Sequence, residues 1–143
     1  MANDLFLKVG NAVHRTLLKA TGGRIGWEVS KMPVVELTTI GRRSGEPRTV
    51  MLTTPHTEGD TIVVVASKGG DDRHPAWFLN LRENPDVEVK TQDQPKHAMT
   101  ARVATPEERA RLWPAITEKH ANYAGYQTKT ERQIPLVLLE PVR

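Results

Sequence analysis

Three arginines gather in residues 41–48, GRRSGEPR. Glycine at positions 41 and 45 permits a positive φ, which can turn successive backbone N–H groups toward one point. Arginine guanidinium groups add forked donors that match a phosphate or a carboxylate. A solvated hairpin turn, whose arginines only keep the surface wet, explains the same residues about equally well. The segment is therefore a candidate anion-binding loop.

A glycine-rich turn, residues 66–70 (ASKGG), directly follows the strongest apolar run of the chain, residues 62–65. Two successive glycines allow a flat ring to approach the backbone closely. Ser67 and Lys68 offer donors to a carbonyl or phenolate oxygen. Taken alone, the segment is explained more simply as an ordinary glycine turn that leads to the next helix.

Two further segments place polar groups beside aromatic rings. Residues 75–81 (PAWFLNL) can form a helix in which Trp77 and Asn80 share one side through their three-residue spacing. Tyr123 and Tyr126, the two tyrosines of the chain, have the same spacing and can line an apolar pocket while offering phenolic protons. Core packing is the commoner use of such spacing, and both interpretations stay open.

The other reactive side chains indicate no different chemistry. Five histidines are scattered without metal-ligand spacing, so no metal site is expected. The chain has no cysteine nucleophile, and Ser67 lies outside a glycine elbow, which argues against a hydrolase. The dinucleotide-binding and Walker glycine patterns are also absent.

Length and composition fit one domain. The 143 residues are 38% hydrophobic, enough for one core, and contain no cysteine for a disulfide framework. Neither a secretory signal nor a long apolar run is present, so a cytoplasmic protein is expected. The pI of about 9.4 also permits a non-catalytic basic module that binds nucleic acid or a cofactor. Two tyrosines and two phenylalanines offer few stacking platforms, and nucleic acid is not an expected partner.

Periodicity predicts the helices that must position these residues. Apolar residues at three-to-four spacing predict an amphipathic helix over 4–20. Pro75 suits the first turn of a second helix that ends before Pro85. A capping box formed by Thr105 and Glu108 begins a third helix, which we expect Pro114 to kink or split.

From residue 34 onward the pattern changes to short β-rich runs separated by glycine and proline. These runs predict six antiparallel strands, at 34–40, 48–54, 61–66, 86–91, 98–103 and 134–139. Six short strands fit a small closed or nearly closed barrel. The expected fold class is therefore mainly β with helices (α+β).

Five segments, taken in order, resemble one known family. They are TTIGRRSGEPR, VVVASKGG, HPAWFLNLRENPDVEV, ATPEERARLW and IPLVLLEP, and they resemble the deazaflavin-dependent nitroreductase and F420H2-dependent quinone reductase family from about residue 34 to the end. The resemblance implies a split β-barrel, like that of flavin-binding oxidases, which binds coenzyme F420 (8-hydroxy-5-deazaflavin) and no metal. It implies one F420-binding domain over 1–143, with a helix and connector in 1–28 and the barrel in 34–143.

Carried over motif by motif, the resemblance implies a cofactor site. The phosphate and acidic tail would be held by Arg42, Arg43, Ser44 and Arg48. The groove would be lined by Thr49, Val50, Met51, Leu52 and Thr53. The deazaflavin ring would be contacted by Ala66, Ser67, Lys68, Gly69, Ala76, Trp77, Asn80 and Tyr123. Negative charge on the reduced acceptor would be stabilised by Tyr126, Tyr123 or Ser67.

The implied reaction is hydride transfer from reduced deazaflavin to an electrophile such as a quinone, an enone or a nitro compound. Thr53 and His120 stand where prodrug-reducing members carry tyrosine, and Met51 replaces a proline, which argues against nitroimidazole reduction. An FMN-binding oxidoreductase of the same barrel class is the alternative, because FMN also presents a phosphate and a tricyclic ring.

The resemblance extends to the start of the chain, where the helix over 4–20 resembles the membrane-leaning helix of the family. Such a helix would place the protein at the inner face of the membrane, whereas packing on its own barrel is the commoner use. The oligomeric state, a homodimer included, stays open.

Overall fold

The computed structural model describes residues 28–29 and 32–142. Eight strands lie in these ranges: β1 Glu28–Val29, β2 Met32–Ile40, β3 Pro47–Thr53, β4 His56–Glu58, β5 Thr61–Val65, β6 Asp86–Lys90, β7 His97–Val103 and β8 Leu136–Pro141. The helix predicted over 4–20 lies outside the described residues, and the single-domain assignment of 1–143 stays a prediction. Among the helices of the described ranges, none has the length and hydropathy that crossing a bilayer requires.

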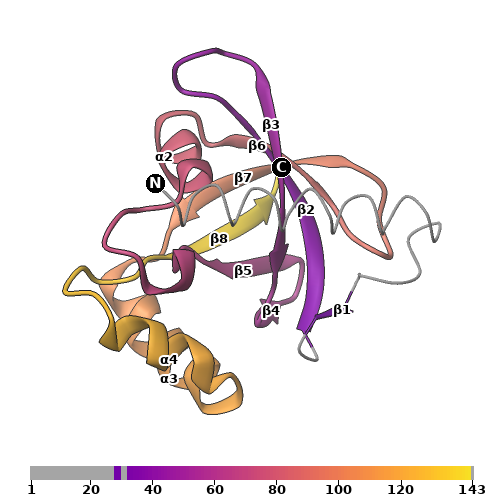
Figure 1. Cartoon of the computed structure of the whole chain (residues 1–143). Coiled ribbons are helices and arrows are strands. Elements are labelled where there is room, and N and C mark those ends of the chain that lie inside the picture. Colours follow the sequence, from indigo (N-terminus) through magenta and orange to yellow (C-terminus); the bar gives the residue numbers. More distant parts are fainter. Residues whose placement is uncertain (1–27, 30–31, 143) are drawn as a thin grey trace.

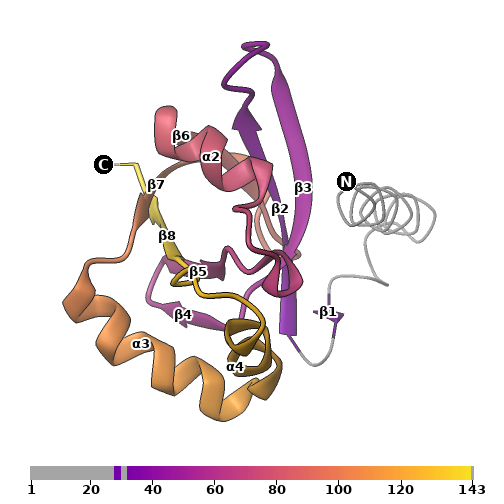
Figure 2. The ribbon, with the colours of Figure 1, turned by 60° about the vertical axis from the view of Figure 1, so that its left-hand side comes forward.

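All strand pairs are antiparallel and form one curled sheet (Figures 1 and 2). The order is β1-β2-β6-β7-β8-β5-β4, and β3 pairs with β2 beside this path. The mainly β fold is therefore confirmed, and so are all six predicted strands, whose ends differ from the predicted ones by at most two residues. β1 and β4 were not predicted, because strands of two and three residues are too short to show an alternating pattern.

Three α-helices accompany the sheet: α2 Ala76–Glu83, α3 Pro106–Lys119 and α4 Ala121–Thr128. The capping box at the start of α3 is confirmed, with Glu108 N donating to Thr105 Oγ1 at 3.2 Å and Thr105 N donating to Glu108 Oε1 at 2.8 Å. The split expected at Pro114 is wrong: α3 runs through it, and the break falls at His120. One missing N–H is tolerated there because Leu112 and Ile116 anchor the helix in the core.

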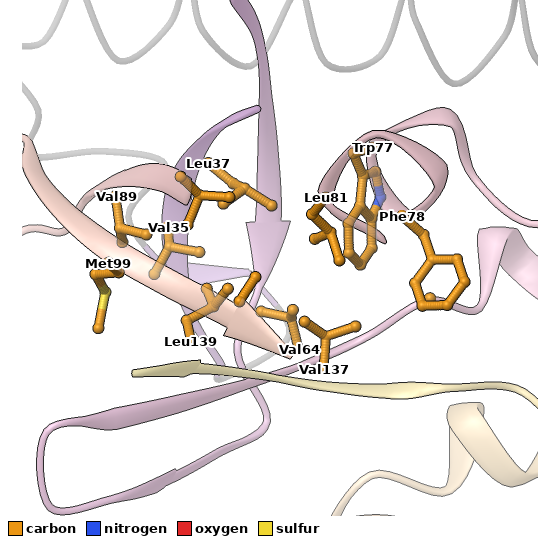
Figure 3. Close-up of a cluster of buried hydrophobic side chains, with 13 residues drawn as sticks. Val35, Leu37, Val64, Trp77, Phe78, Leu81, Val89, Met99, Val137 and Leu139 are labelled. Carbon is orange, nitrogen blue, oxygen red and sulfur yellow. The ribbon is translucent and has the colours of Figure 1, made fainter. Parts of the chain in front are cut away.

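Two apolar clusters lie on opposite faces of β5 and β8. The interior cluster gathers side chains from the curled sheet and α2 (Figure 3), including Val64, Val137 and Leu139. The outer cluster, covered by α3 and α4, takes alternate residues of the same strands, such as Val63 and Leu138. Burial on both faces explains why β5 and β8 are continuous apolar runs in the sequence. By contrast, β6 alternates between buried and exposed residues and so has one exposed face.

Two connections and one pair of helices carry candidate residues. The β2–β3 hairpin projects beyond the rest of the sheet, and residues 41–46 form its connection (Figures 1 and 2). β5 ends at a short 3-10 turn, η1 (Lys68–Gly70), which leads to α2. α3 and α4 lie together against one side of the sheet (Figure 2).

Candidate functional site

The arginine loop, residues 41–48, is closed by two backbone hydrogen bonds. Gly41 N donates to Glu46 O, and Gly45 N donates to Gly41 O, both at 2.8 Å. Gly45 has a φ of +72°, a conformation that favours glycine. Gly41 differs from what the sequence indicated: its φ is not positive, and a Cβ there would lie 2.6 Å from Ser44 Oγ and 3.3 Å from the backbone oxygen of Glu46, so the Ser44 side chain would have to move. The glycines therefore give the loop its tight shape.

Asn80 holds this loop against α2. Its Oδ1 accepts from the backbone N of Arg42 at 3.2 Å and from Arg42 Nη1 at 3.0 Å. Its Nδ2 donates to Thr39 Oγ1 at 3.2 Å, and the side chain is buried. The structure thus brings Asn80 and Arg42 together, and the two residues are hydrogen-bonded to each other. A contact between Asn80 and the cofactor ring stays a prediction.

The remaining arginines of the loop keep unused donors. Arg43 and Arg48 are exposed. In the part of the chain that the structure describes, the Arg43 guanidinium has no hydrogen bond or ion pair, and that of Arg48 reaches only Ser44 Oγ at 3.4 Å. Guanidinium groups without an acidic partner are suited to phosphate and carboxylate oxygens. The donor set of the loop therefore fits a polyanionic cofactor.

Strand β3 divides the five residues predicted to line the groove. Val50 and Leu52 pack against the interior cluster, because successive side chains of a strand point to opposite faces. On the other face, Met51 is buried, Thr49 Oγ1 lies 2.9 Å from Thr38 Oγ1, and Thr53 contacts α4. Val50 and Leu52 are nevertheless only half-buried, so part of each side chain stays accessible.

The turn at residues 66–71 has an unusual backbone. Lys68, Gly69 and Gly70 all have positive φ, at +48°, +64° and +88°. The left-handed conformation costs a non-glycine residue such as Lys68 roughly 1–2 kcal/mol. A Cβ on Gly70 would lie 2.7 Å from the backbone oxygen of Tyr126, so the turn packs directly against α4. Ala66 and Ser67, the first two residues of the turn, are buried.

The two tyrosines share one face of α4, as their spacing predicted. Their rings meet edge to face with centroids 6.0 Å apart. Tyr123 is 4% exposed, and its hydroxyl lies 2.9 Å from Thr53 Oγ1 and 3.6 Å from Met32 Sδ. Burial raises the pKa of Tyr123, and the hydrogen bond with Thr53 opposes that shift. The Tyr123 hydroxyl is therefore protonated and already engaged.

Two other hydroxyls are not engaged in this way. Tyr126 is half-buried, and within the described ranges its hydroxyl has no hydrogen-bond partner. The hydroxyl of Ser67, at the edge of the turn, likewise has none among the described residues. Of the three predicted catalytic residues, Tyr126 and Ser67 can thus donate to a bound molecule without breaking an existing bond.

The start of α2 places Ala76 at the surface and Trp77 in the interior. Trp77 is 8% exposed, belongs to the interior cluster and meets Phe78 edge to face (Figure 3). Packing in the core is thus its observed role, and a contact with the cofactor stays a prediction. Ala76 is exposed in the first turn of the helix.

Arg132 is a residue of this region that the sequence did not reveal. It lies in the connection between α4 and β8 and donates to backbone oxygens of the turn at residues 66–71. A single arginine before a strand has no periodicity or motif that distinguishes it from a surface residue. The described residues contain no group of three or more His, Asp or Glu side chains placed to hold a metal ion.

Comparison with solved structures supports the split-barrel fold. A Listeria innocua protein described as a pyridoxamine 5′-phosphate oxidase matches with a TM-score of 0.52 over 92% of this chain and 94% of its own. The identity is 14%, so this likeness concerns the fold alone. A structure of an F420-H2 dependent reductase, FDR-A, is 42% identical, with a TM-score of 0.67 over 76% of this chain and 94% of its own. A further structure, described as a domain-swapped dimer, is 38% identical, with a TM-score of 0.70 over 90% and 94%.

Sequence comparison identifies the family. An F420H(2)-dependent quinone reductase of Mycobacterium tuberculosis (strain H37Rv) is 40% identical over 131 residues, which cover 89% of this chain and 87% of the relative. The family model for F420H(2)-dependent quinone reductase matches residues 11–141. This chain therefore belongs to the F420H(2)-dependent quinone reductase family, whose cofactor is coenzyme F420.

Proposed function

We propose that this protein binds reduced F420 through the arginine loop and catalyses reduction of a quinone to a quinol. When bound, reduced F420 supplies a hydride. The quinone accepts that hydride and one proton, so two electrons and two protons convert it to the quinol. The main structural support is the exposed loop in which Arg43 and Arg48 keep unused donors while Asn80 fixes Arg42.

The chain's share of this reaction begins with binding and orientation. Arg42, Arg43, Ser44 and Arg48 are assigned to the phosphate and the acidic tail. The β3 residues 49–53 are assigned to the groove beside them. Residues 66–69, together with Ala76, Trp77 and Asn80, are assigned to the deazaflavin ring. Hydrogen bonds hold the backbone of the loop and of β3 in place, whereas the exposed side chains of Arg43 and Arg48 must become ordered when the cofactor binds.

Tyr126 is the preferred group for stabilising negative charge on the quinone oxygen. Its hydroxyl has no partner among the described residues, whereas that of Tyr123 lies against Thr53. Tyr123 then supports the Tyr126 ring through their edge-to-face contact. Ser67 is the second candidate donor. A preorganised hydroxyl of this kind accelerates reaction only if it meets the oxygen on which charge develops.

Cofactor choice and turnover test the proposal together. Fluorescence titration should show F420 binding that FMN does not displace at equal concentration. Anaerobic assays with reduced F420 should then show oxidation of F420 that depends on added quinone. Binding of FMN in preference to F420 would favour the alternative oxidoreductase, and F420 binding without quinone-dependent oxidation would contradict the proposed reaction.

The wider assignments remain proposals of the same kind. Contact of residues 4–20 with an anionic lipid surface is tested by flotation of the full-length protein with vesicles, beside a variant that lacks residues 1–28. A homodimer is tested by light scattering in solution. Reduction of enones and nitro compounds is tested by replacing the quinone in the same assay. The cytoplasmic location expected from the sequence stays a prediction.

A further inference from the structure

Arg132 contacts the turn at residues 66–71 on both sides of its left-handed segment. Before that segment, Nη2 donates to Ser67 O at 2.9 Å, and Nη1 donates to Ala66 O at 3.2 Å. After it, Nε donates to Asp71 O at 2.9 Å. His74 Nδ1 lies 3.2 Å from Nη1. All three guanidinium nitrogens therefore engage residues 66–74.

These contacts are made to backbone oxygens, although carboxylates lie close by. The Asp71 carboxylate is engaged by Arg73, whose backbone N and Nε both donate to Oδ1. Burial lowers the pKa of Arg132, and the charges of Asp71 and Asp72 oppose that shift without providing a direct ion pair. A partly buried arginine that gives its donors to carbonyl groups fixes backbone geometry.

The turn needs such a restraint because its conformation is unfavourable on its own. Lys68 has a φ of +48°, and two glycines with positive φ follow it. A non-glycine residue such as Lys68 keeps this conformation only where the surrounding structure enforces it. From one side, Gly70 is confined by the backbone oxygen of Tyr126. Arg132, from the connection between α4 and β8, joins the two ends of the turn by donating to Ser67 O and Asp71 O.

We propose that Arg132 is a positioning residue that holds the turn at residues 66–71 in the shape required by the deazaflavin ring. This inference rests on the proposed function, in which Ala66, Ser67, Lys68 and Gly69 contact that ring. Arg132 acts through the backbone of the turn and does not itself touch the cofactor. The same turn packs on α4, so Arg132 also fixes the position of the turn relative to Tyr126.

Arg109 provides a matched control. Its guanidinium also donates to a backbone oxygen, that of Ile134 at 3.1 Å, and to Gln127 Oε1 at 3.4 Å. It lies 4.4 Å from the centroid of the Trp113 ring. Burial lowers the pKa of Arg109 as it does that of Arg132. Among the described residues Arg109 has no direct contact with residues 66–71. It is linked to Arg132 through Gln127, whose Nε2 donates to the backbone oxygen of Arg132 at 2.7 Å, so its loss should mainly lower stability.

The test compares three variants of the full-length protein: Arg132→Ala, Arg132→Lys and Arg109→Ala. F420 affinity is measured by fluorescence titration and Tm by calorimetry. Amide hydrogen exchange of residues 66–71 is measured on the protein without ligand. Arg132→Ala should raise the Kd for F420 about tenfold or more and speed exchange in the turn. Arg132→Lys should recover part of the affinity, because an ammonium can reach some of the same oxygens. Arg109→Ala should lower Tm while leaving Kd within about twofold.

Each remaining outcome decides the inference. A folded Arg132→Ala protein with the wild-type Kd would overturn it, as would an equal loss of affinity in Arg109→Ala. If Arg132→Ala does not fold, Arg132→Lys decides: unchanged affinity and exchange would overturn the inference, and faster exchange with weaker binding would support it. Failure of the wild-type protein to bind F420 would instead overturn the proposed function.

Discussion

The arginine loop and the turn at residues 66–71 both belong to the candidate cofactor site, but they are built in opposite ways. The loop is exposed, and its Arg43 and Arg48 side chains keep unused donors. The turn is held from two directions, by α4 and by Arg132, and its left-handed backbone is its main feature. The loop can therefore act through side-chain charge, whereas the turn acts through backbone shape.

This difference predicts different sensitivities to mutation. Truncating Arg43 or Arg48 removes an exposed donor and disturbs little of the fold, so affinity should change without stability. Adding one methyl group at Gly70 displaces backbone, so stability and turnover should change together.

The largest effect is expected for Gly70→Ala. The new Cβ would lie 2.7 Å from the backbone oxygen of Tyr126, at a φ of +88°, and neither group can move without shifting α4. We expect a loss of about 2–4 kcal/mol in the free energy of unfolding and a large loss of turnover. Urea denaturation and quinone assays measure both quantities.

Gly69→Ala is the matched control for that variant. Its φ is +64°, but a Cβ would meet no atom within 4 Å. It should therefore cost only about 1–2 kcal/mol, the free energy of left-handed backbone for a non-glycine residue. Equal destabilisation by the two variants would show that the contact with α4 is unimportant.

Tyr126→Phe should separate turnover from binding. The ring and its contact with Tyr123 remain, and only a hydroxyl without a partner in the described structure is lost. We expect a roughly tenfold to thousandfold lower rate of hydride transfer at unchanged F420 affinity. Stopped-flow oxidation of reduced F420, beside a binding titration, measures both.

Tyr123→Phe serves as the comparison, because it removes the hydrogen bond with Thr53 and should cost about 1 kcal/mol of stability. If Tyr123→Phe or Ser67→Ala loses the rate and Tyr126→Phe keeps it, the donor role moves to the affected residue. If all three stay active, no hydroxyl among them stabilises the acceptor.

Arg48→Ala should weaken F420 binding by about 1–3 kcal/mol, as expected for the loss of a charge-assisted hydrogen bond. The Tm of this variant should stay close to that of the wild type, because the guanidinium of Arg48 has only one hydrogen bond among the described residues, at 3.4 Å to Ser44 Oγ. Arg111→Ala controls for charge, since Arg111 lies on α3 in an ion pair with Glu58. Equal weakening by both variants would indicate a general effect of net charge.

The smallest effect is expected for the pH dependence of stability, through His74, which contacts Arg132. Burial, followed by the charges of Arg132 and Arg82, lowers the pKa of His74 from 6.5. A lowered pKa in the folded state means that the unfolded state binds the proton more readily. The contribution of neutral His74 to stability is therefore complete above about pH 6.5 and declines as the pH falls toward the lowered pKa.

His74→Gln retains an acceptor that does not titrate in this range. Thermal unfolding between pH 7.5 and pH 5 should show a shallower loss of stability for the variant than for the wild type, at about these pH values. Parallel curves of stability against pH for the two proteins would mean that protonation of His74 does not affect stability in this range.

The sequence predicted the parts of the molecule that depend on periodicity or local chemistry. β5 and β8 were evident because burial on both faces makes them continuous apolar runs, and the start of α3 was evident from its capping box. The passage of α3 through Pro114 was missed, because the packing of Leu112 and Ile116 overrides a local preference.

The candidate site was predictable to a similar degree. The glycine and arginine motifs identified the segments, but contacts between distant segments decide what each side chain does. The hydrogen bond between Tyr123 and Thr53 joins residues 70 positions apart, and that between Asn80 and Arg42 joins residues 38 apart. Arg132 shows the limit most clearly, since its partners in residues 66–74 lie 58 to 66 positions away.

Single-turnover hydride transfer is the most direct test of the proposed function. The wild-type protein, loaded with reduced F420 that carries deuterium at the donor carbon, is mixed anaerobically with a quinone in a stopped-flow instrument. We expect one oxidised F420 per quinone reduced, at a rate several-fold below that of the protium form, because the transferred atom moves in the measured step. Bound reduced F420 that remains unoxidised in the presence of quinone would contradict it.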